Sequence, residues 1–236
     1  MNEKGLFTKF SFCYIGILAV AIIMTLAGCS GYRAVQAKNP LYYYGITSVS
    51  VPQFINKSIL PSVSGPLTKS IFLVLAQYPG LTVYSGENPA ADAILIGIIE
   101  SSDHRDKVYN NNIGRKFIDE SSSLKASIGN RPGFYVNNQT NYKLTLRLIL
   151  IKNPDWESVS LARSDLAPQL LASPQIILNE SLALEGSFSH VLDSNTGPDD
   201  GGVTNFTKTK GIYDQSLETI GQSAADWFRG VVINAF

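Results

Sequence analysis

Residues able to perform covalent, metal or acid–base chemistry are few in this chain of 236 residues. Its two cysteines are Cys13 and Cys29, and its two histidines are His104 and His190. Neither histidine has a second ligand at the spacing of a metal motif, and the sequence contains no G-x-S-x-G nucleophile elbow. We therefore expect no catalytic residue and no metal site, and the chemistry of Cys29 becomes the main question: a reactive thiol, a half-disulfide, a metal ligand or a modified residue.

Two short stretches imitate ligand-binding loops. In "SGPLTKS", Lys69-Ser70 follows Thr68 rather than the glycine of a phosphate-binding loop, so the backbone freedom that cradles phosphate is missing. In the segment from Asp193, the sixth position of a calcium loop is Pro198 and the twelfth is Thr204, where glycine and a bidentate glutamate belong. A capped helix start and a solvated turn are the better interpretations, and adjacent carboxylates elsewhere lie in expected loops.

The N-terminal segment has the pattern of an export signal. Lys4 and Lys9 precede an uncharged apolar run over 10–27, which is about as long as the shortest membrane span. The run ends in Leu26-Ala27-Gly28-Cys29, which resembles the lipobox of bacterial lipoproteins. We therefore predict a signal peptide over 1–28 that is removed, with an uncleaved membrane anchor as the alternative.

That resemblance implies a fate for Cys29: its sulfur carries diacylglycerol and its amine an acyl chain. Two or three chains would hold the protein on a membrane almost permanently. No other cofactor is expected. Cys13 leaves with the signal, so the mature chain has no second cysteine for a disulfide. The next residue is Ser30 rather than the aspartate that commonly retains such proteins at the inner membrane, which favours the outer membrane.

Net charge adds no global attraction for nucleic acid. The full chain has 19 basic and 19 acidic residues, and removal of Lys4, Lys9 and Glu3 with the signal leaves 17 and 18. A charge of −1 gives no field that would attract a polyanion. Any charged ligand must be bound locally.

The mature chain predicts an α+β fold, in which two amphipathic helices pack on one face of a four- to five-stranded mixed sheet in a two-layer sandwich. A tether over 29–45 leads into a single domain over 46–236. Alternating or continuous apolar residues predict strands, and apolar residues spaced three and four apart predict helices. The expected strands are 46–54, 81–85, 91–101, 141–152 and 176–190, and the near-continuous apolar run over 91–101 predicts a strand that is covered on both faces. One expected helix has Ser64 as its N-cap, and the other begins near Tyr213.

Three polar segments do not fit this unit: 101–140, 153–175 and 193–211. Loops of such length are usually functional or disordered. The strand after the first segment places Lys143 and Arg147 on one face. The first segment itself contains a basic cluster: Arg105, Lys107, Arg115, Lys116, Lys125 and Arg131. Such groups can donate charge-assisted hydrogen bonds to phosphate, although an ordinary exposed strand face explains them equally well.

The order of motifs resembles the LptE family of lipopolysaccharide-assembly lipoproteins. It consists of Cys29 with "GYR" close behind, "VSVPQFINKS", "GPLTKSI", "ADAILIGIIES" and a C-terminal amphipathic helix. The resemblance implies a non-enzymatic protein anchored on the periplasmic face of the outer membrane, lodged as a plug in an LptD-like β-barrel and binding lipopolysaccharide. We assign the phosphate contact to Lys143 and Arg147 as a hypothesis.

Other envelope lipoproteins share the strand-helix-strand opening with "P-x-F-x-N" and "ADA-x-L-x-G". Secretion-pore lipoproteins of the curli type and activators of peptidoglycan synthases are among them. The alternative is therefore a periplasm-facing lipoprotein that binds other proteins. An envelope hydrolase that uses only carboxylates is a third option without a positive signal.

Overall fold

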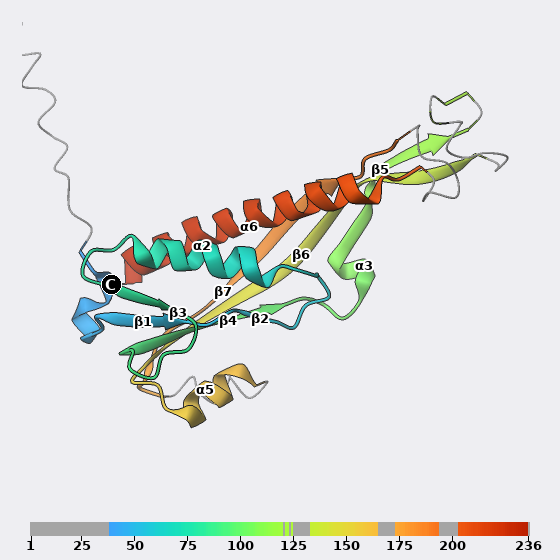
Figure 1. Ribbon diagram of the computed structural model, residues 1–236. Coiled ribbons are helices and arrows are strands. Elements are labelled where there is room, and N and C mark those ends of the chain that lie inside the picture. Colours follow the sequence, from blue (N-terminus) through green and yellow to red (C-terminus); the bar gives the residue numbers. More distant parts are fainter. Residues whose placement is uncertain are drawn as a thin grey trace, which may run out of the picture. The chain divides into compact units, whose positions relative to one another are not determined.

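The structure is a computed structural model, and it describes residues 38–119, 121–122, 124, 133–164, 173–193 and 203–235. The chain divides into two compact units, Met1–Ala37 and Lys38–Phe236, and the second contains every described residue. This unit is an α+β two-layer sandwich, with helices packed against one mixed sheet, and this confirms the expected fold class (Figure 1). No described helix is both long enough and apolar enough to cross a membrane.

The described residues form a sheet of seven strands, more than the four or five expected, and this sheet is organised around β6. One edge of β6 pairs first with β5 and then with β4, and the other edge pairs with β7. On the far side of β4, β1 and β3 run parallel to it, and β2 pairs with its end. The strands are β1 (Ser48–Val51), β2 (Ile55–Asn56), β3 (Thr82–Ser85), β4 (Ala93–Glu100), β5 (Tyr109–Ile118), β6 (Phe134–Lys152) and β7 (Ile176–Ser189).

Two helices cover one face of the sheet, as the periodicity predicts. Helix α2 (Ser64–Ala76) and helix α6 (Phe206–Ala235) lie side by side, and their apolar stripes enter one core (Figure 1). A Cβ atom on Gly221 of α6 would lie only 2.8 Å from Ser70 Oγ of α2, so a glycine allows the helices to approach closely. The predicted cap at Ser64 is wrong: the N-cap is Val63, without a side-chain hydrogen bond.

A short helix, α5 (Trp156–Arg163), covers half of the opposite face. Its Val159 and Ala162 pack on isoleucines of β4 and β6, which explains why β4 is apolar on both faces. The Asp155 carboxylate caps the helix by accepting a hydrogen bond of 2.6 Å from the Ser158 backbone nitrogen. This helix lies in the 153–175 segment, which we expected to be a loop.

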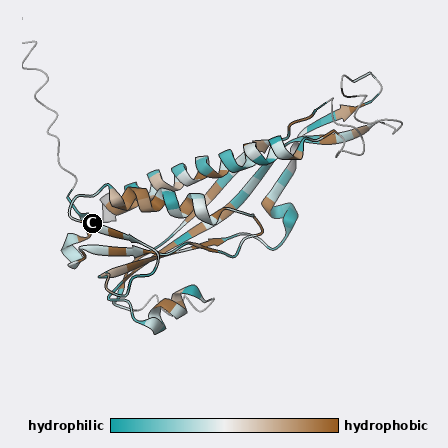
Figure 2. Cartoon of the chain, viewed as in Figure 1, coloured by the Kyte–Doolittle hydropathy of each residue, from teal (hydrophilic) through white to brown (hydrophobic). Residues whose placement is uncertain are grey.

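Structure also extends into the other segments expected to be irregular. The 101–140 segment contains α3 (Arg105–Val108), β5 and the first part of β6. The end of the expected tether folds as the 3-10 helix η1 (Pro40–Tyr44), and Leu41 anchors it, with 1% of its surface exposed. Figure 2 shows that apolar residues concentrate in the strands beneath α2, whereas α3 and the adjoining strands are more polar.

Candidate functional site

The face of the sheet opposite α2 and α6 changes character along β6. Side chains of β6 alternate, so Tyr142, Leu144 and Leu146 are buried towards the two helices. On the opposite face, Ile149 and Ile151 lie beneath α5. Lys143 and Arg147 continue that same face beyond the apolar half, which makes its remaining part polar.

A cavity of about 600 Å³ lies next to Lys143 and also reaches residues of α6 on the helical side of the sheet. Its walls come from α3, β5, β6, β7 and α6, and hydroxyl, amide and charged side chains dominate them. Such a lining fits a hydrophilic ligand better than an apolar one. The lining residues are Lys107, Val108, Asn110, Gln139, Asn141, Tyr142, Lys143, Glu185, Gly186, Ser187, Ser216, Thr219, Ile220 and Ser223.

Lys143 lies in this lining and forms an ion pair with its cross-strand partner. Its Nζ is 2.6 Å from Glu185 Oε1, and the two residues face each other in the β6–β7 register. Both side chains are more than half exposed, at 62% and 67%. Exposed pairs of this kind contribute only about 0–1 kcal/mol, so an anionic ligand can displace Glu185 at little cost.

Arg147 occupies the same face as predicted but is not part of the cavity lining. Its Nε donates a hydrogen bond of 3.1 Å to Asn179 Oδ1 on β7. Four residues along a strand span about 13 Å, so Lys143 and Arg147 cannot clamp one phosphate together. They could contact two anionic groups of one extended ligand.

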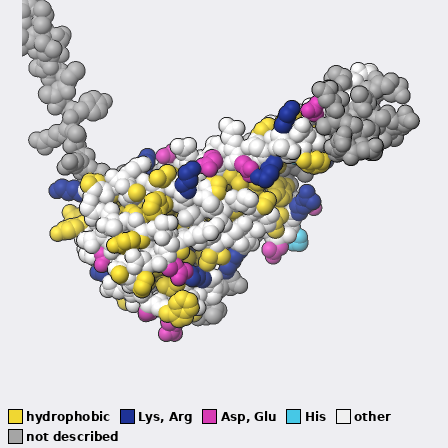
Figure 3. All heavy atoms as spheres, viewed as in Figure 1, with side chains coloured by type: hydrophobic (Ala, Val, Ile, Leu, Met, Phe, Trp, Pro, Cys, Tyr) yellow, Lys and Arg dark blue, Asp and Glu magenta, His cyan; other side chains and the backbone are white. Residues whose placement is uncertain are grey.

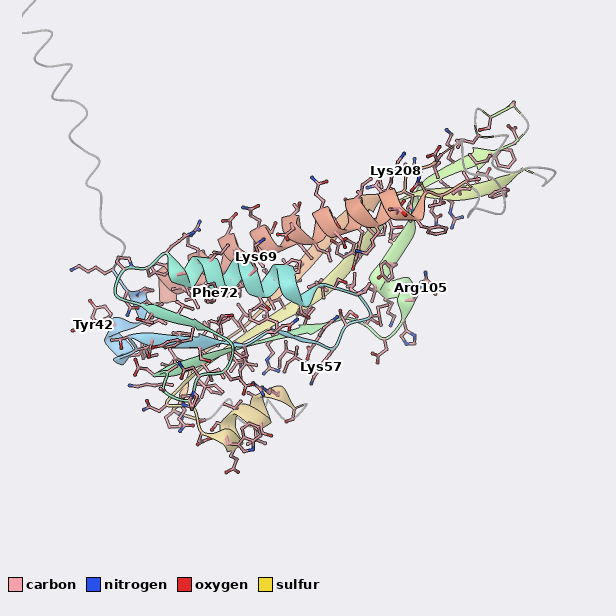
Figure 4. All side chains as sticks on the ribbon, in the orientation of Figure 1. Tyr42, Lys57, Lys69, Phe72, Arg105 and Lys208 are labelled. Carbon is pink, nitrogen blue, oxygen red and sulfur yellow. The ribbon has the colours of Figure 1, made fainter. Side chains whose placement is uncertain are left out.

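Helix α3 supplies a second cation to the cavity, Lys107. Arg105 lies on the same helix (Figure 4). Its guanidinium carbon is 6.0 Å from the centre of the Tyr109 ring, a cation–π arrangement. Both cations belong to the basic cluster noted in the sequence, but the placement of Lys107 beside Lys143 depends on the β5–β6 pairing. Sequence reasoning therefore missed Lys107 as a partner of Lys143.

Cations on the helical face are matched by acids. Lys69 of α2 pairs with Glu218 of α6 at 3.7 Å, and Lys210 pairs with Asp214. Figure 3 shows basic and acidic side chains next to one another along this surface. No broad field of one sign is visible there.

Three aromatic residues, of which Tyr142 is buried and Phe188 and Tyr213 are half-buried, support the cavity from the helix side. The rings of Tyr142, Phe188 and Tyr213 lie within 5.2–6.2 Å of one another. Burial raises the pKa of the Tyr142 hydroxyl and that of Tyr213, so both hydroxyls stay neutral. The Tyr213 hydroxyl donates to the Pro61 carbonyl oxygen at 2.9 Å, which ties α6 to the loop before α2.

The histidines serve different local roles. His104 is the N-cap of α3, and the Nε2 atom of His190 lies 2.8 Å from Thr140 Oγ1. Among the described residues, no group of three or more histidine, cysteine or acidic residues could hold a metal ion.

Several predicted features lie outside the described residues. They are the signal segment 1–28 with lipobox residues Leu26, Ala27 and Gly28, the lipid attachment residue Cys29, the sorting residue Ser30, the tether up to residue 37, and residues 194–202 of the calcium-like segment.

No protein-family model matches this sequence, and no curated protein matches it. Several solved structures show a weak similarity to this chain at low sequence identity. A protein provisionally described as a lipoprotein from Caulobacter crescentus has 8% identity and a TM-score of 0.37, covering 77% of this chain and 87% of that one. A hypothetical protein from Chlamydia trachomatis has 10% identity and a TM-score of 0.34, covering 79% and 98%.

PelC from Paraburkholderia phytofirmans, solved as a dodecamer, has 11% identity and a TM-score of 0.27, covering 76% of this chain and 86% of that one. We draw no functional conclusion from similarities at this level.

Proposed function

We propose that this chain is a non-enzymatic lipoprotein, anchored through Cys29 on the periplasmic face of the outer membrane, that assists lipopolysaccharide insertion together with an LptD-like β-barrel. The lipobox supports lipid attachment at Cys29, and the order of sequence motifs supports a relation to the LptE family. The observation that supports lipopolysaccharide as the ligand is the polar cavity with Lys107 and Lys143 in its lining. Lysine ammonium groups among hydroxyl and amide groups suit a ligand that combines phosphates with sugar hydroxyls.

The ion pair between Lys143 and Glu185 makes this proposal testable in two directions. Lysine is the group that would bind phosphate, and Glu185 competes for it at 2.6 Å. Removing the lysine charge should weaken lipopolysaccharide binding, whereas removing the glutamate charge should strengthen it. A role of this pair in folding alone would make both variants behave alike.

The experiment measures binding of radiolabelled lipopolysaccharide to the full lipidated chain in detergent. We expect Lys143→Gln and Lys107→Gln each to weaken binding several-fold, Lys143→Glu with Arg147→Glu to weaken it further, and Glu185→Gln to strengthen it. Lys69→Gln on the helical face is the matched control and should leave binding unchanged. Unchanged binding in all cavity variants would refute the ligand part of the proposal.

The barrel partner requires a separate test, because a cavity does not identify a protein partner. Lipidated protein carrying a C-terminal tag should co-purify with a large outer-membrane β-barrel from its native host. Recovery without any such barrel would refute the assembly part.

One observation favours the alternative, a periplasm-facing module that binds another protein. Among the described residues, the 14-residue strand β7 pairs with β6 on one edge and with no strand on the other. An open edge of this length can accept an extended strand from a partner. Recovery of a peptidoglycan synthase or a homo-oligomeric ring in the same pull-down, with lipopolysaccharide binding unaffected by the cavity variants, would support this alternative.

A further inference from the structure

The described part of the chain begins with a turn that exposes aromatic side chains. We call residues 40–45 the tyrosine turn. In it, Tyr42 is 70% exposed and Tyr43 is 87% exposed. Figure 4 shows Tyr42 pointing away from the sheet and the helices. Neither ring therefore contributes to the core of this unit.

The tyrosine turn is nevertheless held in one conformation. The Asn39 side-chain oxygen accepts a hydrogen bond of 2.9 Å from the Leu41 backbone nitrogen, and its nitrogen donates to the Ile46 carbonyl oxygen at 2.8 Å. Gly45 closes the turn at a φ of 69°, a left-handed conformation that favours glycine. Leu41 is buried and anchors the turn, while the neighbouring rings stay exposed. Because the turn is already ordered, binding through these rings would cost little conformational entropy.

Two lysines accompany the exposed rings. Lys38 is exposed at the start of the described chain. Lys152 Nζ would lie 3.9 Å from a Cβ on Gly45, so this cation is beside the tyrosine turn. Aromatic rings with a polar tip and nearby cations are the combination found at the boundary between lipid headgroups and acyl chains.

Chain length favours a lipid surface over other occupants. Nine residue steps separate Cys29 from Lys38, and an extended chain spans at most about 3.6 Å per step. If Cys29 is lipidated, Lys38 is held within about 32 Å of the membrane, and the tyrosine turn follows it directly. A partner protein would need to compete with a surface that is always present.

We propose that the tyrosine turn docks on the membrane surface, with Tyr42 and Tyr43 inserted at the headgroup level and Lys38 and Lys152 facing anionic phospholipids. This inference rests on lipidation of Cys29 in the proposed function. Docking would fix the orientation of the domain on the membrane, which attachment through Cys29 alone would not do.

A single fluorescent label tests the docking. Because a lipidated Cys29 has no free thiol, an introduced cysteine can be labelled alone in the mature chain. We would label Tyr43→Cys with an environment-sensitive nitrobenzoxadiazole probe in lipidated protein, reconstituted in vesicles of phosphatidylethanolamine and phosphatidylglycerol. Tyr135→Cys is the matched control, because Tyr135 is also exposed, at 69%.

We expect blue-shifted emission at position 43 and several-fold stronger quenching by a headgroup-level nitroxide lipid than at position 135. Adding Tyr42→Ser should reduce that quenching. Equal, water-like emission at both positions on protein whose Cys29 carries lipid by mass spectrometry would overturn the docking alone. An unmodified Cys29 would overturn both the anchor and the docking.

Discussion

Tyr142 lies with its ring in the space that a side chain at position 186 would occupy. A Cβ on Gly186 would lie 2.4 Å from Cζ and 2.5 Å from the hydroxyl oxygen of Tyr142, which is its direct cross-strand partner. The missing side chain allows the ring to cross β7 and reach α6, where its hydroxyl is 2.8 Å from Ser216 Oγ. This contact joins the sheet to α6 beside the cavity.

Replacing Gly186 with alanine should therefore destabilise the domain. The added methyl forces the buried ring or the strand to move, and overpacking of this kind costs about 1–3 kcal/mol. Gly230→Ala in α6 is the control, since nothing lies within 4 Å of its Cβ position and alanine favours a helix by up to about 1 kcal/mol. Urea denaturation measures both, and an equal loss in the two variants would contradict this account.

The hydrogen bond between Tyr142 and Ser216 should show unequal single-mutant effects. Ser216 Oγ donates its proton to the Tyr213 carbonyl oxygen at 2.7 Å, so the Tyr142 hydroxyl is the donor to Ser216. Ser216→Ala would leave a buried donor unpaired, at about 1–3 kcal/mol, whereas Tyr142→Phe removes the donor and should cost less. In a double-mutant cycle, Tyr142→Phe should partly rescue Ser216→Ala, and strictly additive losses would refute this assignment.

Sequence periodicity predicted the elements whose own residues are buried in a regular pattern. The apolar run of β4, the alternation of β6 and the three- and four-residue spacing of α2 all identified the correct type of element. The covered second face of β4 was also predicted, although α5, the helix that covers it, was not. In each case the burial pattern is local, so a short window of sequence contains it.

The elements that were missed are stabilised by distant partners. Strand β5 reads "YNNNIGRKFI" and pairs with β6, although its Asn110, Arg115 and Lys116 are exposed, so pairing rather than burial explains the strand at these residues. The same applies to the site. Lys143 and Arg147 could be placed on one face from sequence, but Glu185 as the partner of Lys143 depends on the β6–β7 register, which no local pattern reveals.

Asp92 should make stability depend on pH in the acid range. Its Oδ2 accepts hydrogen bonds of 2.7–2.9 Å from the backbone nitrogens and hydroxyls of Thr47 and Ser48. These bonds, led by that from the Thr47 hydroxyl, lower the pKa of the Asp92 carboxyl to about 2, against about 3.9 in an unfolded chain.

Because this pKa is depressed in the folded state, the stabilisation is complete above about pH 4 and is lost as the pH falls towards 2. Urea midpoints measured between pH 2 and pH 5 should rise with pH in the wild type, and the slope should be smaller in Asp92→Asn. A slope that the substitution leaves unchanged would show that other carboxyls account for it.

His190 should produce a second pH dependence, at milder pH. Burial lowers the pKa of the His190 imidazole below its usual 6.5, and Nε2 lies 2.8 Å from Thr140 Oγ1, so the neutral ring can accept the threonine proton. The unfolded state then binds a proton more readily, and stability should decrease as the pH falls below about 6.5. In His190→Gln this decrease should be smaller, because no imidazole is left to protonate. Nuclear magnetic resonance titration of the His190 ring checks the cause directly, and a pKa at or above 6.5 would contradict it.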